Sequence, residues 1–244
     1  MLDRSGPAAF PRTRGSLVER LRDAAAPVRR DAFDALVQGY WKPIYKHVRL
    51  TWHLSREDAE DAVQGFFALS YEKEWLARFD PALARFRTFL RTCVDRFVQN
   101  ERQAAGALKR GGGGVILPLD FAGAEGELAR HEPADPVDQD ELFHREFVRS
   151  LFADAVEEVR EECRLAGKEA QFRLFERYDL GPEDRTTYAD LAREADLPVT
   201  QVTNHLAAVR RMFRARVLER LRALSGSEDE YRAEARAVLG IEVT

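Results

Sequence analysis

Cysteine and long apolar runs are the scarcest features of this 244-residue chain. Its two cysteines, Cys93 and Cys163, lie far apart and form no C-x-x-C pair, which argues against a disulfide framework and a cysteine-based zinc site. No apolar run approaches the roughly 18 residues of a membrane-spanning helix, so we expect no membrane insertion. The first residues, MLDRSGPAAFPRTRGS, are basic and lack the apolar stretch of a secretory signal. We therefore expect a cytoplasmic protein.

Motifs of the common enzyme classes are missing too. There is no G-x-x-x-x-G-K-[ST] phosphate loop, because the glycine run at 111–114 follows Lys109 instead of preceding a lysine. There is no G-x-S-x-G and no H-E-x-x-H, and the five histidines are scattered. We expect no enzymatic activity, no catalytic residue, no cofactor and no bound metal.

Strand signals are nearly absent as well. The run VILPLD at 115–120 begins with β-branched residues, but it is short and Pro118 interrupts it. Almost every other segment places apolar residues at the spacing of a helix. The predicted fold class is therefore all-α, with two helical domains joined by an acidic linker.

Turn residues and composition set the boundaries of these domains. We predict a flexible N-terminus at 1–15, a helical domain at 16–110, a glycine-rich and acidic linker at 111–140 that is partly disordered, a second helical domain at 141–225, and a C-terminal extension at 226–244. Within the extension, residues 228–239 predict a short helix, to which the sequence assigns no role.

Charge is segregated along the chain, although the formal net charge is only −4. Residues 85–114 hold seven Lys/Arg against two Asp/Glu, and residues 205–222 hold six against one. Between them, residues 115–170 hold fifteen Asp/Glu against six Lys/Arg. The two basic segments suit polyanionic partners, which the net charge conceals, but solvated helix faces would explain the charge equally well.

The segment DAEDAVQGFF at 58–67 is the first candidate site. It follows Ser55, which predicts a helix with Ser55 as its N-cap. On this helix the apolar residues share one face and the carboxylates the other. A metal site and a general acid–base pair both need converging groups, so neither is expected here. A solvated face and a docking surface both remain compatible with the pattern.

A second candidate site is the helix predicted at 86–109. Its apolar stripe runs from Phe86 to Phe97, and basic and amide side chains occupy the opposite face. Arginines neutralise phosphates and amides read base edges, so this face suits nucleic acid. The aromatic residues fit a core better than a base-stacking platform, and the loop at 79–85 is the expected place for a pocket.

The sharpest local pattern lies at 187–224. A short helix at 187–195, a turn at 196–198 and a longer helix from Val199 have helix-turn-helix spacing, although a hairpin inside a bundle core would look similar. Asp196 stands where glycine is usual, and aspartate tolerates the left-handed conformation. The residues expected in a DNA major groove are Thr200, Gln201, Thr203, Asn204 and His205, and those expected at phosphates are Arg210, Arg211 and Arg214.

The three candidate sites occur together in one order along the chain. The segments YWKPIYKHVRL (40–50), SREDAEDAVQGFF (55–67) and FDPALARFRTFLRTCVDRFVQNERQ (79–103) resemble sigma region 2, and TTYADLAREADLPVTQVTNHLAAVRRMFR (186–214) resembles sigma region 4. Over residues 16–224 the chain thus resembles a bacterial RNA polymerase sigma factor of the extracytoplasmic-function type. The run ALKRGGGG (107–114) is similar to a subgroup from planctomycetes and related bacteria.

This resemblance implies that domain 16–110 binds core polymerase and the −10 promoter element, and that domain 141–225 binds the −35 element through residues 200–205. The acidic helix would contact the coiled coil of the polymerase β′ subunit through Asp58, Asp61 and Gln64. The family commonly has Glu-Thr-Phe after that glutamine, whereas this chain has Gly-Phe-Phe, so one acid of the surface is missing.

The resemblance also implies a −10 site in which a flipped base enters the loop before the basic helix. The candidate residues are Phe79, Asp80, Arg85, Arg87, Arg91, Arg96, Asn100 and Arg102. The implied partners are core polymerase, through its β′ coiled coil and β flap, promoter DNA, and an anti-sigma factor or another regulator. The acidic linker would take the place of the family's linker in the polymerase channels, and its charge leads us to expect that it packs on the basic helices before polymerase binds.

A stand-alone helix-turn-helix regulator is the alternative function. Such a protein binds an operator as a dimer, and only residues 141–165 offer a helix for a dimer surface. It would also leave the acidic helix without a role. An enzyme is a third class, and the missing motifs argue against it.

Overall fold

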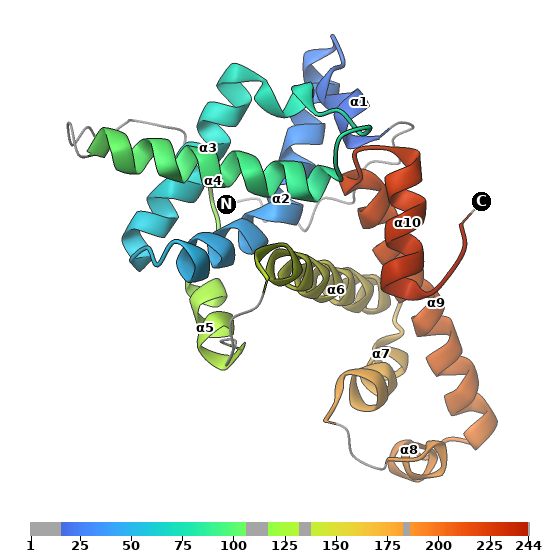
Figure 1. The fold of residues 1–244 in the computed structure, drawn as a ribbon. Helices are drawn as coiled ribbons and strands as arrows, with labels where there is room; N and C mark the ends of the chain where they lie inside the picture. Colours follow the sequence, from blue (N-terminus) through green and yellow to red (C-terminus); the bar gives the residue numbers. More distant parts are fainter. Residues whose placement is uncertain (1–15, 106–116, 132–137, 183–185, 244) are drawn as a thin grey trace, which may run out of the picture. The chain divides into compact units, whose positions relative to one another are not determined.

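The computed structural model describes residues 16–105, 117–131, 138–182 and 186–243. Within these ranges the regular structure is helical and no strand occurs, which confirms the all-α class (Figure 1). The predicted N-terminal segment 1–15, the glycine run 111–114 and the linker residues 132–137 lie outside them. The elements are α1 (Leu17–Leu21), α2 (Ala26–Thr51), α3 (Arg56–Lys73), η1 (Trp75–Arg78), α4 (Phe86–Ala105), α5 (Phe121–His131), α6 (Gln139–Leu165), α7 (Glu169–Phe175), η2 (Glu176–Leu180), α8 (Tyr188–Ala195), α9 (Val199–Leu224) and α10 (Glu228–Leu239).

The described helices divide into two compact units. Residues 151–220 belong to the smaller unit, and residues 16–150 together with 221–243 belong to the larger one. The predicted domains, 16–110 and 141–225, differ from this division, because the observed boundaries fall inside the continuous helices α6 and α9. Helical periodicity runs through both boundaries without a break, so the sequence pattern carries no signal for them.

The larger unit is built on α2. Pro27 in the first turn suits a helix start, and the helix continues past Pro43 to Thr51. The N-cap predicted at Ser55 is confirmed, because its side chain accepts a hydrogen bond from an amide of α3, and Ser16 caps α1 in the same way. The buried residues of this core include Tyr40, Ile44 and Tyr45 of α2, Val63, Phe66 and Phe67 of α3, and Leu90 and Val94 of α4.

Helix α5 occupies part of the segment for which the sequence predicted a partly disordered linker. The Phe121 ring lies 5.5 Å from Trp41 and 5.0 Å from Tyr45, measured between ring centroids. Glu125 accepts hydrogen bonds from Arg49 (2.6 Å) and from the Tyr45 hydroxyl (2.7 Å). The hydrogen bond from Arg49 holds the pKa of Glu125 below its usual value. The expectation of disorder therefore does not hold for this helix, because its acidic and aromatic residues attach it to α2.

A cluster of ion pairs strengthens this attachment. Glu127 of α5 pairs with Lys42 at 2.9 Å and with Lys46 at 2.7 Å. Lys46 also pairs with Glu146 of α6 at 2.8 Å, and both side chains are buried. A buried lysine needs such partners, because an unpaired charge would lose its hydration without compensation. The acidic charge of this part of the linker is thus partly neutralised within the chain.

The smaller unit contains the predicted helix-turn-helix. Thr187 and Asp190 form a capping box at the start of α8. Asp196 ends this helix in the left-handed conformation, with φ of 52°, as the turn requires. The two helices bury a common core that includes Leu191, Ala192, Val202, Leu206 and Val209. The predicted spacing is confirmed as a structural motif.

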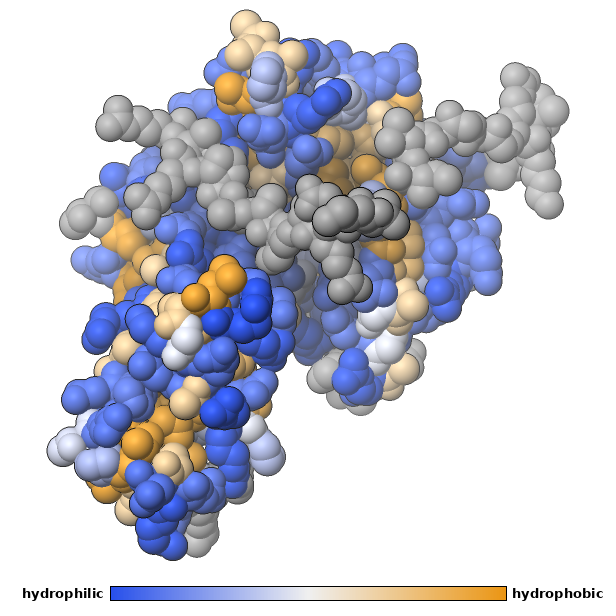
Figure 2. Space-filling model, turned by 180° about the vertical axis from the view of Figure 1, so that it is seen from behind, coloured by the Kyte–Doolittle hydropathy of each residue, from blue (hydrophilic) through white to orange (hydrophobic). Residues whose placement is uncertain are grey.

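The surface and the cysteines agree with the composition. The face drawn in Figure 2 is mostly hydrophilic, with apolar residues in small groups. Among the described helices, none is long and apolar enough to cross a membrane. Cys93 and Cys163 are buried and form no disulfide, as their spacing predicted.

Candidate nucleic-acid interface

The acidic helix α3 begins as the sequence predicts. The Ser55 hydroxyl accepts a hydrogen bond from the Asp58 amide (3.1 Å) and donates one to the Asp58 carboxylate (2.8 Å). Asp58 and Asp61 are exposed, whereas Val63 and Phe66 on the other face are buried. The predicted amphipathic pattern is confirmed, and it presents two carboxylates to solvent.

Gln64, the third residue predicted to contact polymerase, is engaged within the chain. Its side-chain nitrogen donates to the Leu117 carbonyl (3.2 Å), and its side-chain oxygen accepts from the Leu117 amide (2.7 Å). One amide side chain thus satisfies both backbone groups of one residue, as a neighbouring β-strand would. This pair of bonds holds the segment that leads into α5 against α3. A contact between Gln64 and polymerase would require both bonds to be exchanged.

The loop before α4 places its aromatic residue in the core. Phe79 is 1% exposed, and its ring centroid lies 5.2 Å from that of Phe86 and 5.4 Å from that of Phe89. Asp80 is exposed, and its carboxylate accepts a hydrogen bond from the Ala82 amide (2.9 Å). Phe79 is one of the predicted −10 residues, but in this conformation its ring is buried against two others and is not open to a base.

Acidic side chains of α10 cover the N-terminal end of α4. Glu234 pairs with Arg85 at 3.2 Å and with Arg87 at 2.9 Å. Glu230 accepts a hydrogen bond from the Phe86 amide (2.8 Å), one of the N–H groups that a helix leaves unpaired at its start. Arg87 is 7% and Glu234 3% exposed. Carboxylates at this position complement both the arginines and the positive end of the helix dipole.

Arg91, about one turn further along α4, lies between two carboxylates. It pairs with Asp95 on the same helix at 2.7 Å and with Asp140 of α6 at 2.6 Å. Asp95 also accepts a hydrogen bond from Trp52 (2.7 Å) and lies 2.7 Å from the His47 ring nitrogen. Burial opposes the ionisation of Asp95, but these hydrogen bonds and the charge of Arg91 outweigh it and hold the pKa of Asp95 below its usual value.

The other −10 candidates on α4 are exposed. Arg96, Asn100 and Arg102 all lie at the surface of the C-terminal half of the helix. Arg102 donates a hydrogen bond to the Trp52 carbonyl, and its guanidinium lies 5.2 Å from the centre of the Trp52 ring. The basic face of α4 therefore has a covered N-terminal half and an exposed C-terminal half.

The first two turns of α9 form the other candidate face. Thr200, Gln201, Thr203 and Asn204 are exposed, and His205 is half-buried. The buried residues of the same turns face the helix-turn-helix core, so the polar residues project the opposite way. This is the arrangement that a recognition helix needs in order to present side chains to base edges.

The arginines predicted to contact phosphates differ from one another. Arg210 donates two hydrogen bonds to the Asp179 carboxylate (2.8 and 3.0 Å) and one to the Tyr188 hydroxyl (3.0 Å). The hydrogen bonds to Asp179 raise the pKa of Arg210 above its usual value. Arg211 and Arg214 are exposed. Arg210 therefore joins α9 to η2 and α8, while Arg211 and Arg214 are the better placed of the three for a phosphate.

The sequence did not reveal the acidic partners on the covered half of α4. Asp140, Glu230 and Glu234 were not among the candidate residues. Glu230 and Glu234 are four residues apart in a helix that the sequence predicts correctly, so they share one face. That spacing was the available signal, but it does not tell which other helix the face packs against.

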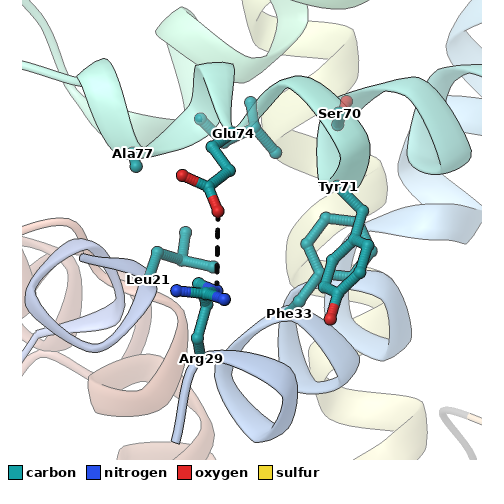
Figure 3. A pocket seen from close by; sticks show the side chains of 8 residues that line it. Leu21, Arg29, Phe33, Ser70, Tyr71, Glu74 and Ala77 are labelled. Atoms are coloured by element: carbon teal, nitrogen blue, oxygen red, sulfur yellow. Dashed lines mark ion pairs between the residues drawn. The ribbon is translucent and has the colours of Figure 1, made fainter. Parts of the chain in front are cut away.

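A small hollow lies between α1, α2, α3 and η1 and contains none of the predicted site residues. Arg29 and Glu74 face each other across it at 3.7 Å, beside the rings of Phe33 and Tyr71 (Figure 3). Its volume of about 20 Å³ holds roughly one water molecule. We therefore assign it no ligand. Within the residues that the structure describes, no cluster of three or more His, Cys, Asp or Glu could hold a metal ion.

Comparison with known proteins adds no assignment. No family model matches the chain, and no match is found among curated proteins or solved structures.

Proposed function

We propose that this chain is a bacterial RNA polymerase sigma factor of the extracytoplasmic-function type. It would bind core polymerase in the cytoplasm, recognise the −10 and −35 promoter elements and start transcription of a specific set of genes, with no catalytic activity of its own. One observation carries the proposal: a single chain presents an exposed acidic helix face, a basic helix and a helix-turn-helix with exposed polar residues. A sigma factor needs all three, and a simple operator-binding protein needs only the last.

The acidic face of α3 is the proposed surface for core polymerase. Asp58 and Asp61 are exposed on a helix whose opposite face is buried, so the two carboxylates are held in a fixed direction. Charges of this kind at the rim of an interface accelerate association and select a partner of opposite charge. The coiled coil of the β′ subunit is the partner that the sequence resemblance suggests, and the β flap would be a second contact.

The start of α9 and the face of α4 are the proposed promoter surfaces. On α9, the exposed Gln201 and Asn204 carry amides that suit base edges in the major groove, and Arg211 and Arg214 suit phosphates. On α4, Arg96, Asn100 and Arg102 are exposed for a −10 element. An anti-sigma factor or another regulator remains a proposed partner.

The test is co-elution of the purified chain with bacterial core polymerase on a sizing column. The variant is Asp58→Arg/Asp61→Arg, and the matched control is Glu72→Arg/Glu242→Arg, which changes the net charge equally. Glu72 and Glu242 have side chains that are 65% and 81% exposed. Glu72 lies about 20 Å along α3 from Asp58, since a helix rises about 1.5 Å per residue.

The proposal predicts that the native chain and the control co-elute with polymerase and that the Asp58→Arg/Asp61→Arg variant does not. Co-elution of all three would reject α3 as the docking face. If none co-elutes and the chain alone retards duplex DNA, the stand-alone regulator is the better assignment.

A further inference from the structure

The proposed function gives α10 no task, yet this helix makes specific contacts with a proposed promoter surface. Its Glu234 side chain receives the guanidinium groups of Arg85 and Arg87. Its Glu230 side chain receives the Phe86 amide through one oxygen and the Gly226 amide through the other, at 2.8 and 2.9 Å. Two carboxylates, four residues apart, therefore occupy three donors at the start of α4.

The position of α10 is set by the segment that leads into it. The carbonyls of Ala223, Leu224 and Ser225 accept hydrogen bonds from the Arg20 side chain (2.7 Å), the Tyr40 hydroxyl (3.2 Å) and the Leu17 amide (2.9 Å). These three donors belong to α1 and α2 of the same unit. The chain thus enters α10 from an anchored point.

Gly226 allows this segment to pass close to α4. A Cβ atom at this position would lie 2.5 Å from the Phe79 ring and 2.9 Å from the Phe86 Cβ, so any larger residue would push the segment away. The Ser227 side chain then caps α10 by accepting a hydrogen bond from the Glu230 amide (3.2 Å). Tyr231 and Ala235 are buried on the same helix. Helix α10 is therefore packed against the start of α4 through buried side chains.

The donors that α10 occupies are those that a nucleic-acid phosphate would use. Arginine pairs with carboxylate and phosphate through the same planar donors, and the first amides of a helix bind either anion. One site cannot bind both anions at once. The adjacent Arg91 is likewise paired with Asp140, so the acidic cover continues along this half of the helix.

We infer that α10 is an internal competitor of nucleic acid, and that Glu230 and Glu234 must leave the start of α4 before a polyanion binds there. The identity of that polyanion as promoter DNA rests on the proposed function. The contact between α10 and the start of α4 does not depend on that function. It would compete with any nucleic acid that binds Arg85 and Arg87.

Displacement of α10 is physically reasonable because the Arg87–Glu234 pair that it would break is buried. Two buried ions regain their hydration when they separate, so a buried ion pair contributes little net stability compared with its separated, solvated ions. A polyanion brings several phosphates and releases its condensed counterions on binding, which favours the exchange. Removing the carboxylate charges should therefore shift the competition towards nucleic acid.

The test measures fluorescence anisotropy of a labelled single-stranded DNA of mixed sequence, about 20 nucleotides long, titrated with the full chain. A single strand limits the contribution of α9, whose helix-turn-helix reads duplex grooves. The variant is Glu230→Gln/Glu234→Gln, and the matched control is Asp229→Asn/Glu242→Gln. The control removes the same charge from side chains that are 98% and 81% exposed.

The inference predicts that Glu230→Gln/Glu234→Gln binds the strand about tenfold more tightly than the native chain, with a steeper salt dependence by roughly one phosphate contact for each freed arginine. The control should bind within about twofold of the native chain, because its charges are screened by solvent. Equal affinity of variant and control would overturn the inference. If the double variant does not show a cooperative thermal transition, the strand affinity of Glu234→Gln alone is compared with that of the native chain and the control.

This result is independent of polymerase binding. If the Glu230→Gln/Glu234→Gln variant binds the strand more tightly but the chain does not co-elute with polymerase, the competition by α10 is supported and the proposed function is rejected. If the chain co-elutes with polymerase but the variant binds the strand no more tightly than the native chain, the proposed function is supported and the competition by α10 is rejected.

Discussion

The start of α4 and the start of α9 are both candidate nucleic-acid surfaces, but the first is covered by other parts of the chain and the second is exposed. Both helices present arginines and polar side chains on one face and bury apolar residues on the other. At the start of α4 the arginines are paired with Glu234 and Asp140, whereas at the start of α9 Gln201 and Asn204 are exposed. A basic helix face read from the sequence is therefore not yet a binding surface. Its state depends on elements that are distant in the sequence.

The two faces should also respond differently to substitution. At the covered face Arg87 and Glu234 are buried, so each depends on its partner for compensation. On α9, Arg211 and Arg214 are exposed to solvent and should contribute little to folding. The same substitution made once at each face should therefore change the free energy of unfolding by different amounts.

The largest expected difference is between Arg87→Ala and Arg214→Ala. Loss of Arg87 leaves Glu234 buried without its closest partner and should lower the free energy of unfolding by about 3–5 kcal/mol. Arg214 is exposed, and its loss should change the free energy of unfolding by no more than about 0.5 kcal/mol. Urea unfolding of the two variants measures the difference. Equal values would show that the cover of α4 does not hold in solution.

A second expected difference is between Gly226→Ala and Gly126→Ala. The Cβ added at Gly226 meets the Phe79 ring at 2.5 Å and should cost about 1–3 kcal/mol of unfolding free energy. The Cβ added at Gly126, in the exposed middle of α5, meets nothing within 4 Å and should add about 0.5–1 kcal/mol. Gly226→Ala should also raise affinity for the single strand, because it displaces α10. If Gly226→Ala lowers stability but does not raise affinity for the single strand, the packing of α10 on α4 does not control DNA binding.

At the open face, the prediction concerns binding to duplex DNA. Asn204→Ala should weaken binding of the holoenzyme to its selected promoter by about 1–3 kcal/mol and relax the preference at one base pair. Arg211→Ala should weaken binding to all sequences alike and reduce the salt slope by about one. Anisotropy titrations at several salt concentrations distinguish the two. A uniform loss for Asn204→Ala would remove it from the base-reading residues.

The smallest expected difference is in the titration of two carboxyl groups. Burial raises the pKa of Glu230 above its usual 4.5, so the stability of its seat is fully present below pH 4.5 and declines as the pH rises through the raised pKa. The hydrogen bond from Thr187 lowers the pKa of Asp190 below its usual 3.8, so the cap of α8 is stable above that pH and weakens as the pH falls through the lowered pKa.

Nuclear magnetic resonance of carboxyl carbons, assigned with Glu230→Gln and Asp190→Asn, measures both titrations. The two pKa values should lie on opposite sides of those of free Glu and Asp. A Glu230 carboxyl with an ordinary pKa would show that burial does not outweigh the hydrogen bonds from the Phe86 and Gly226 amides.

The sequence predicted local features well because their causes are local. The N-cap at Ser55, the amphipathic pattern of α3 and the left-handed turn at Asp196 all depend on residues a few positions away. The short helix at 228–239 was predicted at its observed bounds. Each of these elements satisfies its own backbone groups or buries its own apolar face.

The features that the sequence did not predict all involve long-range pairing. Glu234 of α10 forms an ion pair with Arg87 of α4, and Gln64 of α3 forms two hydrogen bonds with the backbone of Leu117. The composition of the linker was taken as a sign of partial disorder, whereas its Glu125 and Glu127 have basic partners on α2. Charge sign indicates that such pairs are possible, but only the arrangement of the helices decides which of them form.

The most direct test of the proposed function is selection of duplex DNA fragments from a random library by the chain, with and without core polymerase. A sigma factor predicts enrichment only when polymerase is present, and enriched fragments that share two sequence blocks at a fixed spacing, one for α4 and one for α9. Enrichment of a single inverted repeat by the chain alone would contradict it and identify a stand-alone helix-turn-helix regulator.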